Sequence, residues 1–157
     1  MDTSKDNAGV IILPPVLYAI ALVVVFALRW LWPLPVFAAH VAAVRWAGLA
    51  LVPLAFGIGA WGAVTLRKAG TNVNPMLPST AIVASGPFAF SRNPLYVGLA
   101  IAFAGITLAL NTWWGFIVLV PVIVLMHFGV ILREERYLAG KFGDPYRDYC
   151  SRVRRYF

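Results

Sequence analysis

Four long apolar stretches, separated by short polar breaks, dominate the chain. They occupy residues 11–31, 46–66, 95–110 and 113–132. An α-helix rises about 1.5 Å per residue, so about 20 residues cross a hydrocarbon core of about 30 Å. The pattern therefore predicts an all-α fold, a polytopic membrane helical bundle with about four transmembrane helices in one domain spanning residues 1–157.

Composition supports the same class. Hydrophobic residues make up 61% of the chain and charged residues 12%, against roughly 45–50% and 25% in soluble domains. The net charge of +7 does not indicate a nucleic-acid partner, because the basic residues flank apolar spans and form no patch interleaved with aromatic residues. Membrane lipids with anionic headgroups are the expected partner. A single cysteine, Cys150, excludes an internal disulfide, and no metal site is expected.

The basic residues also predict an orientation. With four spans, both termini and the loop at residues 67–94 lie on one side, and they carry all the Lys and Arg residues except Arg29 and Arg45. The positive-inside rule then places this side in the cytoplasm. We therefore expect an integral membrane protein, in the cell inner membrane, with cytoplasmic N- and C-termini.

Three polar segments flank the predicted spans. Residues 1–9 are expected to form a short disordered lead, and residues 67–94 form a long loop rich in Gly, Asn, Pro, Ser and Thr. A loop of this length in a compact domain is usually either functional or disordered, and the turn residues Pro75, Pro78 and Gly86-Pro87 favour function. Residues 133–157 form a basic tail, predicted to be amphipathic and cytoplasmic.

Helix-ending and helix-starting residues divide the tail into two predicted helices. We expect its first helix to end at Gly143 and a second to begin with Asp144 as N-cap. Asp148 and Arg152 are four residues apart and are predicted to pair. Four other basic residues of the tail are expected on a solvated, headgroup-facing surface: Lys141, Arg147, Arg154 and Arg155.

A few residues stand out within the apolar stretches. Gly57, Gly59 and Gly62 favour close approach of a neighbouring helix. His127 lies inside the fourth stretch, where it is either functional or a neutral group bonded to a neighbouring helix. His40, near the start of the second helix, is interpreted as an interfacial packing residue.

Two polar clusters lie at the edge of apolar runs, on the same predicted side. Gly86-Pro87 indicates a turn, and the Asn93-Pro94 step predicts a helix that begins at Pro94. The free backbone N–H groups at the start of this helix can bind a carboxylate or phosphate. Glu134 and Glu135 add carboxylates that suit an ammonium or ribose hydroxyls.

In these clusters, from about Thr71 onward, the chain resembles the integral membrane methyltransferases of the isoprenylcysteine carboxyl methyltransferase and phospholipid methyltransferase group. The family pattern is a glycine turn with an aromatic residue, an Arg-His/Asn-Pro-x-Tyr run, a helical hairpin, a Glu pair and an aromatic tail. The matching segments are Gly86-Pro87-Phe88, Arg92-Asn93-Pro94-Leu95-Tyr96, Glu134-Glu135-Arg136-Tyr137-Leu138 and Phe142-Gly143-Asp144-Pro145-Tyr146-Arg147-Asp148-Tyr149.

The resemblance implies transfer of a methyl group from S-adenosyl-L-methionine to a lipophilic small-molecule or lipid acceptor from the bilayer, leaving S-adenosyl-L-homocysteine. A carboxylate acceptor would need no base, whereas an amine would need one. Carried over residue by residue, the cofactor-binding positions are Thr80, Ala81, Ile82, Val83, Phe88, Asn93, Pro94, Leu95, Tyr96 and Glu134.

The chain departs from the prenylcysteine enzymes at two positions. Asn93 stands where they carry His, which still allows a hydrogen bond to the cofactor. Val130 stands where they carry a basic residue one turn before the Glu pair, so Arg133 or Arg152 is expected to orient the acceptor. The candidate catalytic residues are therefore Arg133, Asp148 and Arg152.

Three alternatives remain at this stage. One is phospholipid N-methyltransferase activity on an ethanolamine-type headgroup. Another is a membrane scaffold protein of the same fold without enzymatic activity. A transporter or channel is a third, but the first three spans have almost no polar lining of the kind such proteins need.

Overall fold

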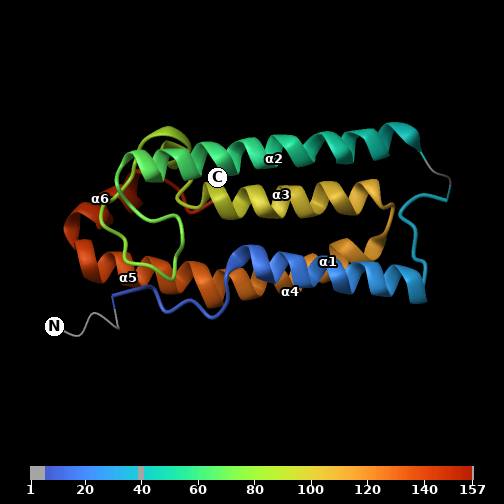
Figure 1. The fold of residues 1–157 in the computed structure, drawn as a ribbon, viewed down its shortest axis with the longest axis horizontal. Helices are drawn as coiled ribbons and strands as arrows, with labels where there is room; N and C mark the ends of the chain where they lie inside the picture. The colour runs from blue at the N-terminus through green and yellow to red at the C-terminus, as the bar shows by residue number, and fades with distance from the viewer. Residues whose placement is uncertain (1–5, 39–40, 157) are drawn as a thin grey trace.

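The computed structural model describes residues 6–38 and 41–156, and within these every regular element is helical. His40 lies outside the described residues. In chain order the helices are α1 (Pro14–Leu31), α2 (Ala42–Lys68), η2 (Gly86–Ala89), α3 (Pro94–Ala109), α4 (Trp113–Met126), η3 (His127–Ile131), α5 (Leu132–Phe142) and α6 (Asp144–Arg152). Figure 1 shows α1 to α4 lying side by side as an elongated bundle, with α5, α6 and the loop before α3 at one end.

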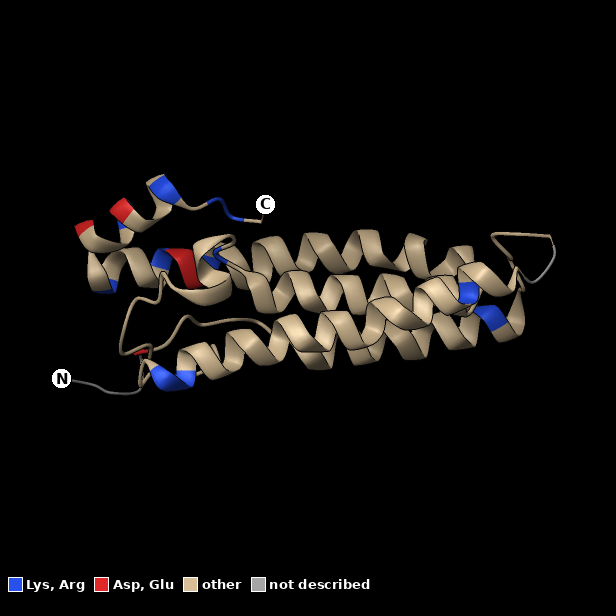
Figure 2. Ribbon diagram, turned by 90° about the horizontal axis from the view of Figure 1, so that it is seen from above, with Lys and Arg blue, Asp and Glu red and all other residues tan. Residues whose placement is uncertain are grey.

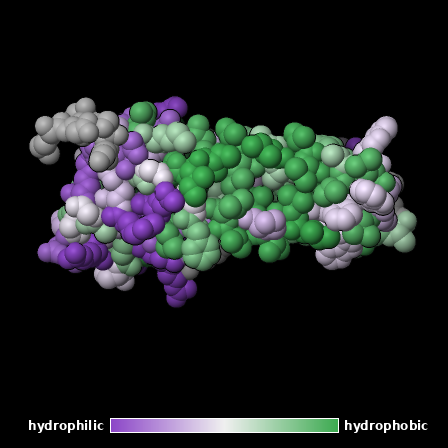
Figure 3. All heavy atoms as spheres, turned by 90° about the horizontal axis from the view of Figure 1, so that it is seen from below, coloured by the Kyte–Doolittle hydropathy of each residue, from purple (hydrophilic) through white to green (hydrophobic). Residues whose placement is uncertain are grey.

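The bundle has the surface of a membrane protein. Three of its helices are long and apolar enough to cross a membrane, namely α1, α2 and the continuous helix from Trp113 to Phe142. Large apolar side chains such as Phe56, Val120 and Phe128 are exposed. Figure 3 shows a broad hydrophobic surface over the helices and hydrophilic residues gathered at one end. The predicted class, an all-α membrane bundle, is confirmed.

The third apolar stretch forms a shorter helix than the others. α3 begins at Pro94, as predicted, since proline fits the first helical position. It has 16 residues, which correspond to about 24 Å of rise, less than a hydrocarbon core of about 30 Å. α3 therefore depends on its neighbours, above all on α2, against which it packs most extensively.

Glycine permits the close approach of α2 and α3, but mostly not at the predicted positions. A β-carbon at Gly48 would lie 2.6 Å from the Gly105 carbonyl oxygen, and one at Gly105 would lie 2.7 Å from that of Gly48. Of the three predicted glycines, only Gly62 faces a packed neighbour, Leu95. A β-carbon on Gly57 or Gly59 would meet nothing within 4 Å, although the backbone nitrogen of Gly59 would lie 3.7 Å from a β-carbon on Gly98 of α3.

A second packing zone joins α1 to α3 and α4. Val25, Phe103 and Val130 are buried at its centre. The rings of Tyr18 and Phe103 meet edge to face, with centroids 5.8 Å apart, a geometry that aromatic pairs favour. This zone holds α1 against the hairpin of α3 and α4.

The fourth apolar stretch does not end as a separate helix at residue 132. α4 continues through the π-helical segment η3 into α5, so a single helix of 30 residues leaves the apolar zone and enters the polar end. In η3 the Gly129 carbonyl oxygen accepts a hydrogen bond from the backbone N–H of Ile11. The segment before α1 is therefore attached to this long helix.

The residues expected to form a disordered lead are ordered where the structure describes them. Asp6 binds Lys141, with a 2.7 Å contact between the carboxylate and Nζ, and the Gly9 carbonyl oxygen accepts a hydrogen bond from Arg133. This N-terminal segment lies across α5, because the helix presents basic groups that match its acceptors. Lys141 is exposed, as predicted, and it also pairs with Asp6.

Charge is divided between the two ends of the bundle. Figure 2 shows a small group of basic residues at the end of the bundle where α1 ends and α2 begins, and most of the charged residues at the opposite end. Two predictions in this region are wrong in detail. Asp144 is the first residue of α6, with Gly143 as N-cap, and pairs with Arg147. Arg152 donates to the backbone carbonyl of Asp148 and not to its carboxylate.

Candidate functional site

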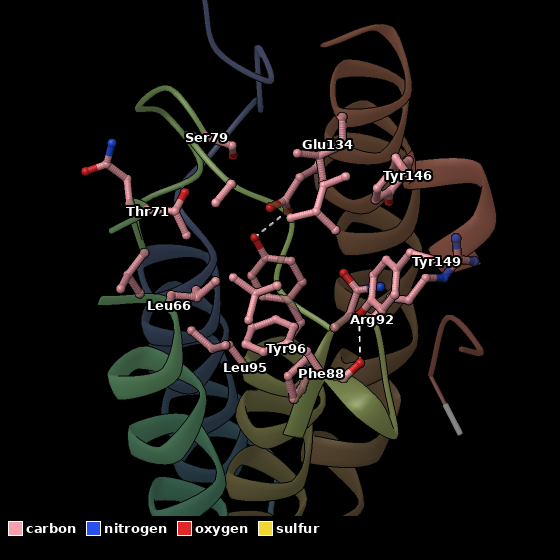
Figure 4. A pocket seen from close by; sticks show the side chains of 18 residues that line it. Leu66, Thr71, Ser79, Phe88, Arg92, Leu95, Tyr96, Glu134, Tyr146 and Tyr149 are labelled. Carbon is pink, nitrogen blue, oxygen red and sulfur yellow. Dashed lines mark hydrogen bonds between the residues drawn. The ribbon is translucent and has the colours of Figure 1, made fainter. Parts of the chain in front are cut away.

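A pocket lies at the polar end, between the C-terminal end of α2, the start of α3, the side of α5 and the face of α6 (Figure 4). It contains about 690 Å³ of space free of protein atoms, part of it open to solvent. Nine of the ten predicted cofactor-binding residues line it: Ala81, Ile82, Val83, Phe88, Asn93, Pro94, Leu95, Tyr96 and Glu134. Residues far apart in the sequence thus meet in one cavity.

Thr80, the tenth predicted residue, supports the pocket from outside. Its hydroxyl donates to the Gly70 carbonyl oxygen at 2.7 Å, and its N–H donates to Thr71 Oγ1 at 3.0 Å. Ser79 N–H donates to the Tyr137 hydroxyl oxygen at 3.1 Å. The loop after α2 is thereby folded back onto itself and joined to α5, with Thr71 and Ser79 as part of the wall.

The glycine turn shapes the floor of the pocket. Gly86 has a φ of +59°, and a β-carbon there would lie 2.9 Å from Thr65 Oγ1; both features favour glycine. The turn continues as η2 and buries Phe88. The Tyr149 hydroxyl donates to the Phe88 carbonyl oxygen at 2.8 Å, so α6 is joined to the backbone of this turn.

Glu134 brings a carboxylate to the pocket. The Tyr96 hydroxyl donates to Glu134 Oε2 at 2.8 Å (Figure 4). α5 carries five charged residues, so Glu134 lies beyond the membrane-spanning part of the long helix. Burial raises the pKa of Glu134 above its ordinary value, although the Tyr96 hydrogen bond acts in the opposite direction. The carboxylate has further acceptor capacity for hydroxyl or ammonium donors.

Glu135 has a structural task instead. Its two carboxylate oxygens accept hydrogen bonds from Arg155 Nε and Nη2 at 2.9 and 2.7 Å, and Arg92 Nη2 lies 3.3 Å from Oε1. All three side chains are partly shielded from water. This Arg92–Glu135–Arg155 cluster ties the start of α3 to α5 and the C-terminal tail. The prediction that Arg155 is a solvated surface residue is wrong.

The C-terminal tail closes the site from behind. The Arg154 carbonyl oxygen accepts from Arg92 N–H at 3.0 Å, and that of Arg155 accepts from Asn93 Nδ2 at 3.0 Å. The Asn93 amide, expected to bond the cofactor, thus holds the tail in this structure. Asn93 is buried and still contributes to the pocket lining.

The three candidate catalytic residues are not brought together. Arg133 points to the Gly9 carbonyl oxygen, and Asp148 and Arg152 are exposed on α6. None of them lines the pocket. Helical phase explains this, because Glu134 faces the pocket and its neighbour Arg133 therefore points elsewhere.

Nine residues that line the pocket were not predicted from the sequence: Leu66, Thr71, Asn72, Val73, Ser79, Arg92, Leu138, Tyr146 and Tyr149. Arg92, Leu138, Tyr146 and Tyr149 belong to motifs that carry the resemblance, so those motifs held a signal. Arg92 is the most informative of the four, because its Nε is buried and has no hydrogen-bond partner among the described residues. Thr71, Asn72 and Ser79 lie in the irregular loop, where no periodicity marks them.

A second cavity adjoins the first on the membrane side. It contains about 890 Å³ of free space, part of it open, between α3 and α4, with Tyr18 of α1 also in its wall. Most of its lining is aliphatic, including Val97, Ile101 and Ile123. Tyr96 lines both cavities and therefore separates the polar pocket from the apolar one.

Comparison with known proteins gives one positive result. A family model described as phospholipid methyltransferase matches residues 43–145, a segment that includes most of α2, the loop, α3, α4 and α5. No curated protein and no solved structure matches the chain.

Proposed function

The chain belongs to the phospholipid methyltransferase family, and from this premise we propose that it transfers a methyl group from S-adenosylmethionine to a lipophilic acceptor at the membrane surface. The observation that carries the proposal is the pocket in which Tyr96 and Glu134 meet, because it joins a polar, partly solvated cavity to an apolar one. A water-soluble cofactor and a lipid-soluble acceptor require such a pair of adjacent sites.

The polar pocket fits the cofactor chemically. Phe88, Leu95 and Tyr149 offer apolar and aromatic surface for an adenine ring. Glu134 offers a partly buried carboxylate as acceptor for ribose hydroxyls or an ammonium group. The unpartnered Nε of Arg92 is a donor suited to a carboxylate. The sulfonium of the bound cofactor supplies an activated methyl group.

The residues of this chain have positioning roles in the proposed reaction. Methyl transfer is an in-line displacement, in which alignment of the two reactants and exclusion of water supply most of the acceleration. The Tyr96 ring stands between the two cavities, where it orients both reactants and blocks bulk water. The Tyr149 contact to Phe88 and the Arg92–Glu135–Arg155 cluster keep the walls of the pocket fixed.

The apolar cavity receives the acceptor in this proposal. Its walls are helices α3 and α4, so a lipid can enter sideways from the bilayer without crossing water. Two acceptor classes fit this route: a prenylated cysteine carboxylate, as the resemblance to the prenylcysteine enzymes implies, and an ethanolamine-type phospholipid amine, as the description of the matching family implies. The positive-inside rule adds that the pocket faces the cytoplasm.

The test combines binding and turnover. We expect S-adenosylhomocysteine to bind the purified protein in calorimetric titration and to raise its thermal unfolding midpoint by mass action. Incubation with radiolabelled S-adenosylmethionine and a total membrane lipid extract should then label a lipid. Absence of binding at millimolar ligand in well-folded protein would favour a scaffold protein without enzymatic activity.

A further inference from the structure

One pair of polar side chains lies outside the cofactor pocket and is not used by the mechanism above. His127 Nδ1 and the Tyr156 hydroxyl oxygen are 2.6 Å apart. His127 is the first residue of η3, at the point where the long helix changes from α to π geometry. Tyr156 belongs to the C-terminal tail, 29 residues further along the chain. The hydrogen bond therefore depends on the tertiary fold and not on local sequence.

The position of Tyr156 relates this pair to the acceptor. Tyr156 lines the apolar cavity together with Tyr96 and Tyr18. The three hydroxyl-bearing residues are the polar members of a lining that is otherwise aliphatic or thioether. Tyr96 marks the boundary with the cofactor pocket, so the polar head of a lipid in this cavity meets Tyr96 and Tyr156 together.

The fold holds Tyr156 firmly at this position. The residue before it, Arg155, makes the two-pronged contact with Glu135, and its carbonyl oxygen accepts from Asn93. Val153, three residues before Tyr156, is buried against α6 and the loop. A tail anchored at these points presents the Tyr156 hydroxyl to both His127 and the cavity.

We infer that Tyr156 and His127 form a proton-accepting pair for an amine acceptor bound in the apolar cavity, with Tyr156 touching the amine and His127 acting through Tyr156. The inference rests on the proposed methyltransferase function and narrows its acceptor to the amine class. A carboxylate acceptor would have no use for the pair, because it has no proton to lose.

Proton transfer precedes methyl transfer in the proposed reaction. The bound ammonium gives one proton to the Tyr156 oxygen, while the Tyr156 hydroxyl proton moves to His127 Nδ1, leaving a neutral amine and an imidazolium. The amine lone pair then forms the new N–C bond, the S–C bond of the cofactor breaks, and its electron pair stays on sulfur as a thioether. His127 afterwards returns its proton to water at the membrane surface.

The surroundings of the pair contain few charges. Tyr156 is the titratable group that contacts His127 among the described residues, and Phe128 covers one side of the imidazole, with ring centroids 4.7 Å apart. Arg155 and Glu135 act on Tyr156 from the tail and from α5, and Tyr18 faces it from α1. The Arg155 and Glu135 charges act on Tyr156 in opposite directions.

The experiment uses full-length protein in nanodiscs that contain phosphatidylethanolamine, with radiolabelled S-adenosylmethionine. The variants are Tyr156→Phe, which keeps the ring, and His127→Asn, which keeps a hydrogen-bond acceptor near Nδ1 but cannot take a proton. General-base catalysis typically contributes 10²–10⁴-fold, so we expect each variant to lose about 100-fold in kcat at pH 7. The loss should shrink toward pH 10, because an alkyl amine deprotonates unaided near its pKa of about 10.

Two controls make the result interpretable. Val124→Ala alters an exposed position on α4 and should retain the parent pH profile. S-adenosylhomocysteine titration of every protein should give the parent affinity, because the pair lies outside the cofactor pocket. If Tyr156 and His127 only held the tail in place, both variants would lose activity to the same extent at every pH.

Three other results would contradict the inference. Labelled phosphatidylethanolamine in the parent, with both variants within threefold at every pH, would overturn it. Labelling of an S-prenylcysteine carboxylate but not of phosphatidylethanolamine would overturn it while sustaining the methyltransferase function. Failure of the parent to bind S-adenosylhomocysteine would remove the methyltransferase function first, and the inference with it.

Discussion

The apolar bundle and the polar end of this protein are stabilised in different ways. In the bundle, α2 and α3 meet at Gly48 and Gly105, where backbones touch and no charged group takes part. At the polar end, the Arg92–Glu135–Arg155 cluster joins three segments distant in sequence. The difference follows from the solvent. Lipid tails are as apolar as the side chains, so the hydrophobic effect does not drive helices together in the membrane. Close packing at small residues then determines which helices associate.

Two adjacent residues of α5 differ in the same way within the polar end. Glu134 faces the pocket that we propose for the cofactor, whereas Glu135 faces Arg92 and Arg155. This contrast suggests four experiments that test how far the division holds.

The largest effect is expected from Glu135→Gln. Loss of one member of a buried ion pair costs about 3–5 kcal/mol, and the lower end applies here because Arg155 is 34% exposed. We expect a reduced free energy of unfolding and a released tail. The matched control is Asp144→Asn, whose partner Arg147 is 71% exposed and whose loss should cost about 0–1 kcal/mol. Denaturation monitored by circular dichroism in detergent compares the two, and equal costs would contradict a charge-stabilised polar end.

Gly48→Leu tests the bundle. Its β-carbon would lie within 3 Å of backbone atoms of α3, and backbone cannot move aside as a flexible side chain can. Overpacking typically costs 1–3 kcal/mol, and we expect about 2 kcal/mol here, less than for Glu135→Gln. Gly57→Leu, on the open side of the same helix, is the control and should be nearly neutral. If both variants unfold alike, the close contact of α2 and α3 does not limit stability.

Glu134→Gln should affect binding more than folding. A charge-assisted hydrogen bond contributes about 1.5–3 kcal/mol, so S-adenosylhomocysteine affinity should fall about 10- to 150-fold. The thermal unfolding midpoint without ligand should stay near that of the parent, because the amide still accepts from Tyr96. Calorimetric titration measures the affinity. A change of less than threefold would remove Glu134 from the cofactor site.

The smallest effect is expected from Asp6→Asn at the N-terminal segment. Hydrogen bonds from Lys141 and then Tyr137 lower the pKa of Asp6 below its ordinary value. A lowered carboxyl pKa stabilises the folded state above the unfolded-state pKa of about 4, and the gain is lost as pH falls through the lowered value. Parent and variant should therefore differ slightly in unfolding midpoint at pH 7 and converge near pH 3. A difference that persists at pH 3 would assign the effect to packing.

Much of the site could be predicted because its residues lie in short motifs beside helix starts. Pro94 marked the beginning of α3 by local chemistry alone, and Glu134 marked the point where the long helix leaves the apolar zone. Arg133 illustrates the limit of such reasoning. It adjoins Glu134 in sequence, but the phase of the helix and the position of the N-terminal segment direct it to Gly9.

The sequence by itself determined the all-α membrane class, the segregation of basic residues to one end and the family, because hydropathy, charge and motif spacing are local properties. Only the tertiary structure decided that Gly48 and not Gly57 meets α3, that Glu135 holds Arg92 and Arg155, and that Tyr156 reaches His127. These outcomes depend on which faces of helices meet and on where the C-terminal tail turns back. Such contacts join residues tens of positions apart, and no local pattern records them.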